Sequence, residues 1–330
     1  MQAVIRRLGK CLKIFVQRIS RQPEMGVLIA FFFVLSGFGL GAEGFFTLRT
    51  MAGVLTVIAE LGILTIGITL LMISGEFDLS VGSVLAISSI ICAFLLRIGV
   101  IDFLAFFAAL IFAAILGWLN GVIVVLTGIP SFIATLGTMM FWRGILLAIT
   151  GGLPTIPFFG ESKILSLLNS PMVKDFRTSA VWMMVIVFVA HLVLRQTAYG
   201  NWVYATGGNK EAARSMGVPI ARVKIINFTL SGLLAGLAGL MQLARFRTVD
   251  ALRGQGMELE AIAAAVTGGV LLSGGYGSIF GALLGVLIVG IVRTGLVLAK
   301  APPYWYQAFV GLILIVAVVI NIQIKKKGQI

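Results

Sequence analysis

The feature that most constrains this chain is a succession of apolar segments, each about as long as a lipid bilayer is thick. A helix needs about 20 mostly apolar residues to cross the hydrocarbon layer. Since 59% of the 330 residues are hydrophobic and only 11% are charged, no soluble core could hold them all. We therefore predict an all-α, polytopic integral membrane protein with about ten spans, near residues 26–46, 52–73, 80–98, 103–126, 132–150, 178–198, 225–243, 259–273, 277–299 and 306–323.

The net charge of +13 is concentrated near the ends of predicted spans. Basic residues that flank apolar spans mark the cytoplasmic side of a membrane protein. They gather before the first span, after the sixth and at the C-terminus, as Arg6, Arg7, Lys10, Lys13, Arg18, Arg21, Arg195, Lys210, Arg214, Arg222, Lys224, Lys325, Lys326 and Lys327. An even number of spans puts both termini on one side, which the basic residues identify as cytoplasmic.

This topology predicts a single transmembrane domain over residues 1–330. Residues 1–25 form a retained basic cytoplasmic leader, because no small-residue cleavage site follows the apolar run from Gly26. Residues 199–223 form a cytoplasmic loop, and residues 151–177 form a long periplasmic one. Nucleic acid is not an expected partner, since no aromatic and basic surface segment accompanies the charge, whereas membrane lipid is.

Few residues are suited to enzymatic chemistry. Cys11 and Cys92 lack metal-ligand spacing and lie in very different surroundings, and His191 is the one histidine. The sequence has no Gly-x-x-x-x-Gly-Lys-[Ser/Thr] phosphate loop. We therefore expect no catalytic residues, no metal and no cofactor on this chain, so an energy source must be another chain or an ion gradient.

Three glycine pairs have a spacing of four residues, which places each pair on one face of a helix and lets neighbouring backbones approach closely. They are Gly117–Gly121, Gly232–Gly236 and Gly281–Gly285. This pattern predicts tight helix packing in a compact bundle.

The loop after the sixth span contains a complete set of helix signals. Asn209 is a good N-cap, Glu211 suits the first turn, and Gly217 with Pro219 ends the helix. We predict a short helix of about two turns. Its small residues, Ala212 and Ala213, leave room for another protein surface, although a solvated helix at the membrane interface fits the same signals.

Three separated stretches resemble one family. Glu211-Ala212-Ala213-Arg214-Ser215-Met216-Gly217 resembles the EAA-type loop of ABC importer permeases, within a longer similar stretch from Gly208 to Gly239. Asp78-Leu79-Ser80-Val81-Gly82 follows the second span, and Phe132 to Gly144 contains the third match. Together they resemble the ribose, xylose and arabinose permeases, a branch related to branched-chain amino acid permeases. The chain departs from many sugar members at Glu76-Phe77, where those members have glycine and isoleucine.

The resemblance implies a permease subunit of a bacterial inner-membrane importer for a simple sugar, with a ribose-like pentose favoured. Its partners would be a second permease copy or a paralogue, a cytoplasmic ABC ATPase and a periplasmic sugar-binding protein. The ATPase would receive the loop residues Asn209, Lys210, Glu211, Ala212, Ala213, Arg214 and Gly217. Leu272-Ser273-Gly274-Gly275-Tyr276 is similar to an ATPase signature, but without a phosphate loop it predicts a turn between helices.

Other candidate residues have more than one interpretation. Asp78, with Ser80 and Gly82, caps the third span, gates the pathway or contacts the ATPase. Asn120, Thr135 and Thr138 are candidates for lining a sugar pathway. Arg49, Arg245 and Arg247 lie at predicted periplasmic ends, where they dock a binding protein or simply extend to the interface.

A second class of protein also fits the spans. An ion-gradient carrier needs a buried carboxylate or an interrupted helix to hold its coupling ion. Glu60 is the clear mid-span carboxylate here. A permease for a branched-chain amino acid is the alternative within the ABC class, and a membrane enzyme is the least supported.

Overall fold

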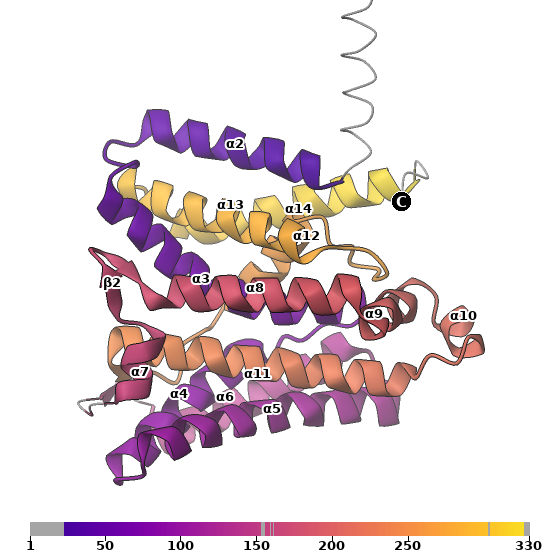
Figure 1. Ribbon diagram of the computed structural model, residues 1–330, viewed down its shortest axis with the longest axis horizontal. Helices are drawn as coiled ribbons and strands as arrows, with labels where there is room; N and C mark the ends of the chain where they lie inside the picture. The colour runs from indigo at the N-terminus through magenta and orange to yellow at the C-terminus, as the bar shows by residue number, and fades with distance from the viewer. Residues whose placement is uncertain (1–22, 153–155, 159, 161, 303, 327–330) are drawn as a thin grey trace, which may run out of the picture.

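The computed structural model describes residues 23–152, 156–158, 160, 162–302 and 304–326. Most of the predicted leader, residues 1–22, and Lys327 lie outside this part of the chain. Ten helices occupy the ten predicted positions (Figure 1): α2 (Pro23–Gly41), α3 (Leu48–Ile73), α4 (Val81–Arg97), α5 (Asp102–Thr127), α6 (Ser131–Ile149), α8 (Thr178–Gln196), α11 (Ile220–Phe246), α12 (Met257–Thr267), α13 (Ile279–Leu298) and α14 (Tyr304–Lys326).

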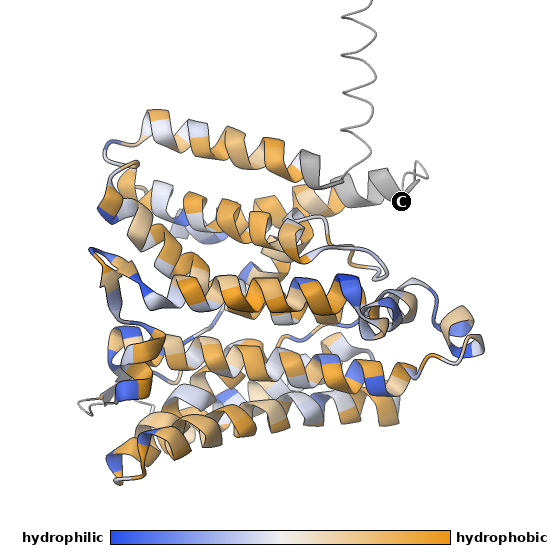
Figure 2. Cartoon of the chain, in the orientation of Figure 1, coloured by the Kyte–Doolittle hydropathy of each residue, from blue (hydrophilic) through white to orange (hydrophobic). Residues whose placement is uncertain are grey.

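The long helices lie side by side in a bundle. In the described residues, six helices are long and apolar enough to cross a membrane, and the apolar segments Gly26–Gly41, Val81–Arg97 and Tyr304–Val319 are shorter. Apolar residues cover most of the bundle, and hydrophilic ones gather toward its two ends (Figure 2). The prediction of an all-α, polytopic membrane protein is confirmed.

Helix α12 corrects one predicted span. It has 11 residues and ends at Thr267, so it rises only about 17 Å and does not cross the bilayer alone. The predicted helix through residue 273 is wrong, because the chain turns at Gly268 and Gly269, the latter with φ of +87°. Residues 271–278 then run without helical structure to α13, so the predicted turn at Leu272–Tyr276 is confirmed.

The two long loops contain more structure than predicted. Residues 199–223 hold a helix that sequence reasoning missed, α9 (Ala198–Gly208), and the predicted short helix, α10 (Lys210–Ser215). The loop 151–177 holds α7 (Lys163–Leu168) and short strands. Strand β1 (Ile156–Pro157) pairs antiparallel with β4 (Thr248–Val249), and β2 (Pro171–Val173) pairs with β3 (Phe176–Arg177).

The predicted glycine faces are contact surfaces. A Cβ on Gly117 of α5 would lie 3.1 Å from the Cα of Gly232 of α11, and one on Gly285 of α13 would lie 2.9 Å from the Gly268 nitrogen that follows α12. These helix backbones touch with no room for a side chain, as the spacing predicted.

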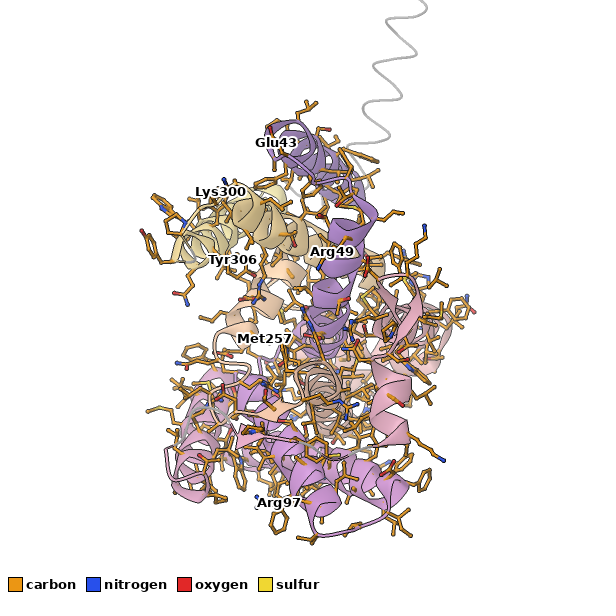
Figure 3. The ribbon with its side chains drawn as sticks, turned by 90° about the vertical axis from the view of Figure 1, so that its left-hand side faces the viewer. Glu43, Arg49, Arg97, Met257, Lys300 and Tyr306 are labelled. Atoms are coloured by element: carbon orange, nitrogen blue, oxygen red, sulfur yellow. The ribbon has the colours of Figure 1, made fainter. Side chains whose placement is uncertain are left out.

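The two ends of the bundle differ. Helices α9 and α10 project at one end, where α2 also begins and α14 ends (Figure 1). Glu43, Arg49, Arg97, Lys300 and Tyr306 lie toward the opposite end (Figure 3). The chain therefore enters and leaves the bundle at the end that carries α10.

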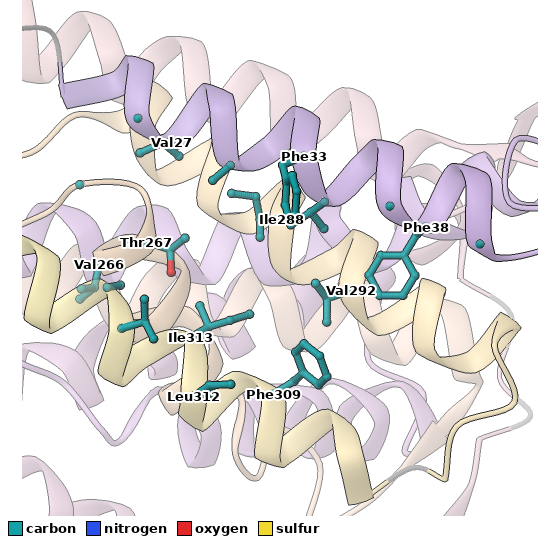
Figure 4. Close-up of a pocket in the computed structure, with 18 of the residues that line it drawn as sticks. Val27, Phe33, Phe38, Val266, Thr267, Ile288, Val292, Phe309, Leu312 and Ile313 are labelled. Atoms are coloured by element: carbon teal, nitrogen blue, oxygen red, sulfur yellow. The ribbon is translucent and has the colours of Figure 1, made fainter. Parts of the chain in front are cut away.

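An apolar cavity of about 750 Å³ opens between α2, α12, α13 and α14 (Figure 4). Phe33, Phe38, Val292, Phe309 and Leu312 are among the residues that line it, and Thr267 is the lining residue with a polar side chain. Such a surface suits hydrocarbon rather than water.

Candidate functional site

Helix α10 is fixed by its own local sequence. The Asn209 side chain accepts hydrogen bonds from the backbone N–H groups of Glu211, at 3.1 Å, and Ala212, at 3.0 Å. Gly217 ends the turn with φ of +78°, a conformation that favours glycine. The predicted cap and stop residues therefore have the predicted roles.

The outer surface of α10 is open. Lys210, Glu211, Ala212 and Arg214 are exposed, while Ala213 is buried against the bundle. Met216 at the end of the helix is 84% exposed. The exposed charged side chains of α10 and the exposed Met216 together form a surface suited to contact with another protein.

Helix α10 is connected to the bundle through glycines. Gly207 and Gly208 at the end of α9 pack against Gly274 and Gly275, whose added Cβ atoms would lie 3.0 Å from the Gly207 Cα and 2.6 Å from the Gly208 Cα. A Cβ on Gly274 would also lie 2.8 Å from the Cα of Gly75. The end of α9 and two loops from distant parts of the sequence therefore meet backbone to backbone near α10.

Residues 74–80, which we call the buried segment, connect α3 to α4 without helical structure. Asp78 is 0% exposed. Its Oδ1 accepts from the Ser80 N–H at 2.9 Å and the Ser80 hydroxyl at 2.6 Å, and its Oδ2 accepts from Ser231 of α11 at 3.1 Å. The bond to the Ser80 N–H is made to the residue just before α4. Among the described residues, no side chain caps the first turn of α4, so the predicted cap of the third span is not observed.

The buried segment lies deep in the bundle. Ser231 is eleven residues after Ile220, where α11 begins, which is about 16 Å along the helix axis. Non-helical backbone at such depth is tolerated where protein buries it or where it lines an aqueous path, because lipid offers its polar groups no hydrogen bonds. The segment is therefore a non-helical connection between two helices, buried within the protein.

Two of the three predicted pathway residues hold this segment. Asn120 of α5 donates from Nδ2 to the Ser80 hydroxyl at 2.7 Å, and the Thr135 hydroxyl of α6 accepts from the Leu79 N–H at 3.1 Å. Both side chains are buried. Thr138 is half-buried and donates to the Thr135 carbonyl at 3.2 Å. Whether these residues meet a sugar stays a prediction.

Gly82 brings α4 against the turn that precedes α12. A Cβ there would lie 2.6 Å from the Gly254 carbonyl oxygen and 2.5 Å from a carboxylate oxygen of Glu258. The same carboxyl group accepts from the Gly256 N–H through its other oxygen at 3.0 Å. The glycine of the motif at 78–82 therefore makes room for the start of α12.

Sequence reasoning missed Glu76 as a site residue. Its carboxylate is paired with Lys224 of α11 and lies 3.5 Å from Nζ of Lys210 in α10. The sequence signals were the acidic pair with Asp78 and the departure at Glu76-Phe77, and neither indicated the two lysines, which are distant in the sequence.

The three predicted docking arginines have different surroundings. Arg49 and Arg247 are exposed near the end opposite α10, and Arg247 donates to the Gly160 carbonyl at 2.9 Å. Arg245 instead points into the bundle and is bonded to Glu60. The structure therefore separates Arg245 from the other two.

Further ionisable residues surround the start of α12. Arg143 of α6 donates to the carbonyls of Ala251 and Arg253, and Arg293 of α13 lies 3.6 Å from Glu260. The two arginines therefore have partners within the protein, and the Arg293 side chain is also 44% exposed. In the described ranges, no group of three or more His, Cys, Asp and Glu side chains could hold a metal ion.

A bundle of apolar helices, with a buried polar segment between α3 and α4 and a short capped helix outside, is the architecture of a multi-pass membrane protein. The family described as branched-chain amino acid transport system / permease component matches residues 50–318, and the chain belongs to this family.

The chain is similar to three named relatives along most of its length. It is 39% identical to the probable ABC transporter permease protein YphD of Escherichia coli (strain K12), over 96% of this chain and 94% of that protein. It is 35% identical to the ribose import permease protein RbsC of the same strain, over 90% and 93%. It is 34% identical to the autoinducer 2 import system permease protein LsrC of Escherichia coli O9:H4 (strain HS), over 93% and 88%. No solved structure matches the chain.

Proposed function

We propose that this chain is the membrane-spanning permease subunit of an ATP-driven ABC importer for a simple sugar, with a ribose-like pentose favoured. The observation that carries the proposal is α10, a capped helix outside the bundle with open charged residues and the 84% exposed Met216. The family match and the similarity to RbsC, a ribose import permease, support it.

The proposal assigns a side to each end of the bundle. The end with α9 and α10 is cytoplasmic, together with the leader at 1–25 and the coupling loop at 199–223. The loop at 151–177 is periplasmic, and the whole chain is one domain in the bacterial inner membrane. The shared location of the start of α2, the end of α14 and α10 supports this assignment (Figure 1).

The proposed machine has several chains. A cytoplasmic ABC ATPase binds α10 and hydrolyses ATP, so the permease needs no catalytic residue and no cofactor of its own. A periplasmic sugar-binding protein docks at the opposite end, where Arg49 and Arg247 are exposed. A second permease copy, or a paralogue, completes the pathway within the membrane.

Sugar passage is proposed to involve the surroundings of the buried segment. Thr138 is partly exposed on α6, whereas Asn120 and Thr135 are hydrogen-bonded to the segment. A sugar could therefore reach Asn120 and Thr135 only when the segment moves. This would make Asp78 part of a gate in addition to its hydrogen bonds to Ser80 and Ser231.

The first test is affinity purification of the tagged full-length chain from its native membrane, followed by mass spectrometry. Co-purification of an ABC ATPase and a periplasmic sugar-binding protein is the expected result. Glu211→Lys should then remove the ATPase, while Glu43→Gln, an exposed change at the opposite end, should retain it.

An ion-gradient carrier is the competing class. Its candidate ion site was Glu60, but that carboxylate is bonded to Arg245, so an ion would have to displace an arginine. Recovery of the chain without an ATPase, under conditions that keep other ABC complexes intact, would contradict the proposal. Uptake that stops when the ion gradient is collapsed, at unchanged ATP, would support the carrier.

A further inference from the structure

Glu76 is the point where α10 meets the buried segment. Its carboxylate pairs with Lys224 at the base of α11 and lies 3.5 Å from Nζ of Lys210, the first residue of α10. The side chains of Glu76 and Lys224 are 7% and 12% exposed, whereas that of Lys210 is 55% exposed. One buried carboxylate therefore joins a cation inside the bundle to a cation on the projecting helix.

The residues that follow Glu76 are bonded to other helices. The Phe77 N–H donates to Ser131 of α6 at 3.0 Å, and the Leu79 N–H donates to Thr135 of the same helix. Asp78 accepts from Ser231 of α11, and Ser80 accepts from Asn120 of α5. Residues 76–80 therefore connect Glu76, which pairs with Lys210 of α10, to the three helices α5, α6 and α11.

Glycine backbones surround the start of this connection. Gly75 lies against Gly207 and Gly274. A Cβ on Gly75 would lie 3.5 Å from the Gly207 Cα, and a Cβ on Gly274 would lie 2.8 Å from the Gly75 Cα. At this contact the three glycines contribute only backbone atoms. The neighbouring residue Glu76 contributes the charged side chain, which pairs with Lys210 and Lys224. The pair of Glu76 with Lys224 is the one shielded from water, and it is much stronger than a surface pair. Lys210 is 55% exposed, so it adds a weaker second attraction to Glu76, which changes when α10 moves.

We infer that Glu76 is a positioning residue that transmits movement of α10 to the buried segment. The inference rests on the proposed function, because it needs an ATPase that moves α10. When α10 shifts, Lys210 pulls on or releases the Glu76 carboxylate, and the residues bonded to α5, α6 and α11 follow. The function assigned to Glu76 is mechanical, and Glu76 does not touch the sugar.

The test is hydrogen exchange on the full-length permease bound to its co-purified ATPase, with and without ATP plus vanadate. This measurement needs no knowledge of the sugar. In the wild-type chain, exchange should change both in residues 210–217 and in residues 77–83. In Glu76→Gln the change at 210–217 should persist, while the change at 77–83 should shrink about tenfold, as expected for the loss of a typical coupling energy between sites.

Lys210→Gln keeps the test decisive if Glu76→Gln does not fold, because Lys210 is more than half exposed. It should reduce the response at 77–83 in the same direction. Glu43→Gln is the matched control and should behave as the wild-type chain. A wild-type response at 77–83 in Lys210→Gln would overturn the inference. No response at 210–217 in the wild-type chain would instead overturn the proposed function, and the inference with it.

Discussion

The guanidinium of Arg245 lies against both carboxylate oxygens of Glu60, with its Nη1 at 3.2 Å from Oε1 and 3.3 Å from Oε2, although 185 residues separate the two in the sequence. The pair ties α3 to the end of α11. Glu60 is 3% exposed, so its carboxylate has lost its contact with water, and the hydrogen bonds from Arg245 stabilise the buried charge instead.

Removing one partner of this pair should harm the protein more than removing both. Arg245→Met leaves an unpaired buried carboxylate, and breaking such a pair costs about 3–5 kcal/mol. The double variant Glu60→Gln with Arg245→Met should recover most of that loss. Thermal unfolding of the detergent-purified chain measures both. Equal loss in the single and double variants would show that the charges are not coupled.

The glycine contact between α5 and α11 should not tolerate a side chain. Gly117→Ala would place a Cβ within about 2.2 Å of the Phe228 carbonyl oxygen, so the two helices would have to separate, which we expect to cost several kcal/mol. Gly144→Ala in α6 is the matched control, because nothing lies within 4 Å of an added Cβ there. It should be neutral or stabilising by up to about 1 kcal/mol. Unfolding temperature compares the two, and equal effects would contradict the packing argument.

Loss of the cap should loosen α10 without affecting the bundle. Asn209→Ala removes both hydrogen bonds to the first turn and should cost about 1 kcal/mol locally. Faster hydrogen exchange at residues 211–213 is the expected observation. Asn201→Ala on the exposed surface of α9 should leave that exchange unchanged.

Asp78→Asn distinguishes a structural role of Asp78 from a role in a gate. The amide keeps an oxygen that can accept from Ser80 and has nearly the same shape, so folding and assembly should persist. If Asp78 only holds the buried segment in place through Ser80 and Ser231, transport should also persist. If the carboxylate is part of a gate, uptake should fall at least about tenfold with normal assembly. Uptake and co-purification, measured on the same membranes, separate these outcomes.

The exposed arginines at the end opposite α10 give a test of docking. Arg49→Glu with Arg247→Glu should weaken the binding protein's stimulation of ATP hydrolysis about tenfold, since reversed charge opposes association. Lys174→Glu, also exposed and in the loop between β2 and β3, is the control. An unchanged stimulation in the double variant would exclude docking at these arginines. Arg245 is not suitable for this test, because its replacement breaks the pair with Glu60.

Several features follow from the sequence by itself. The positions of the membrane helices depend on the length of apolar runs, because the bilayer selects for length and polarity alone. The limits of α10 depend on Asn209 and Gly217, which act on backbone groups within three residues. The glycine faces depend on helical periodicity. Each of these depends on close neighbours in the chain, so each could be predicted.

Tertiary structure decided the rest. Glu76 and Lys224 are brought together by packing, as are Glu60 and Arg245, and nothing near these residues in the sequence identifies the partner. Asn120 and Thr135 hold the buried segment because α5 and α6 lie against it, which local patterns do not encode. Hydrogen bonds and ion pairs between membrane helices form only where two helices are in contact, and these contacts exist only in the folded bundle.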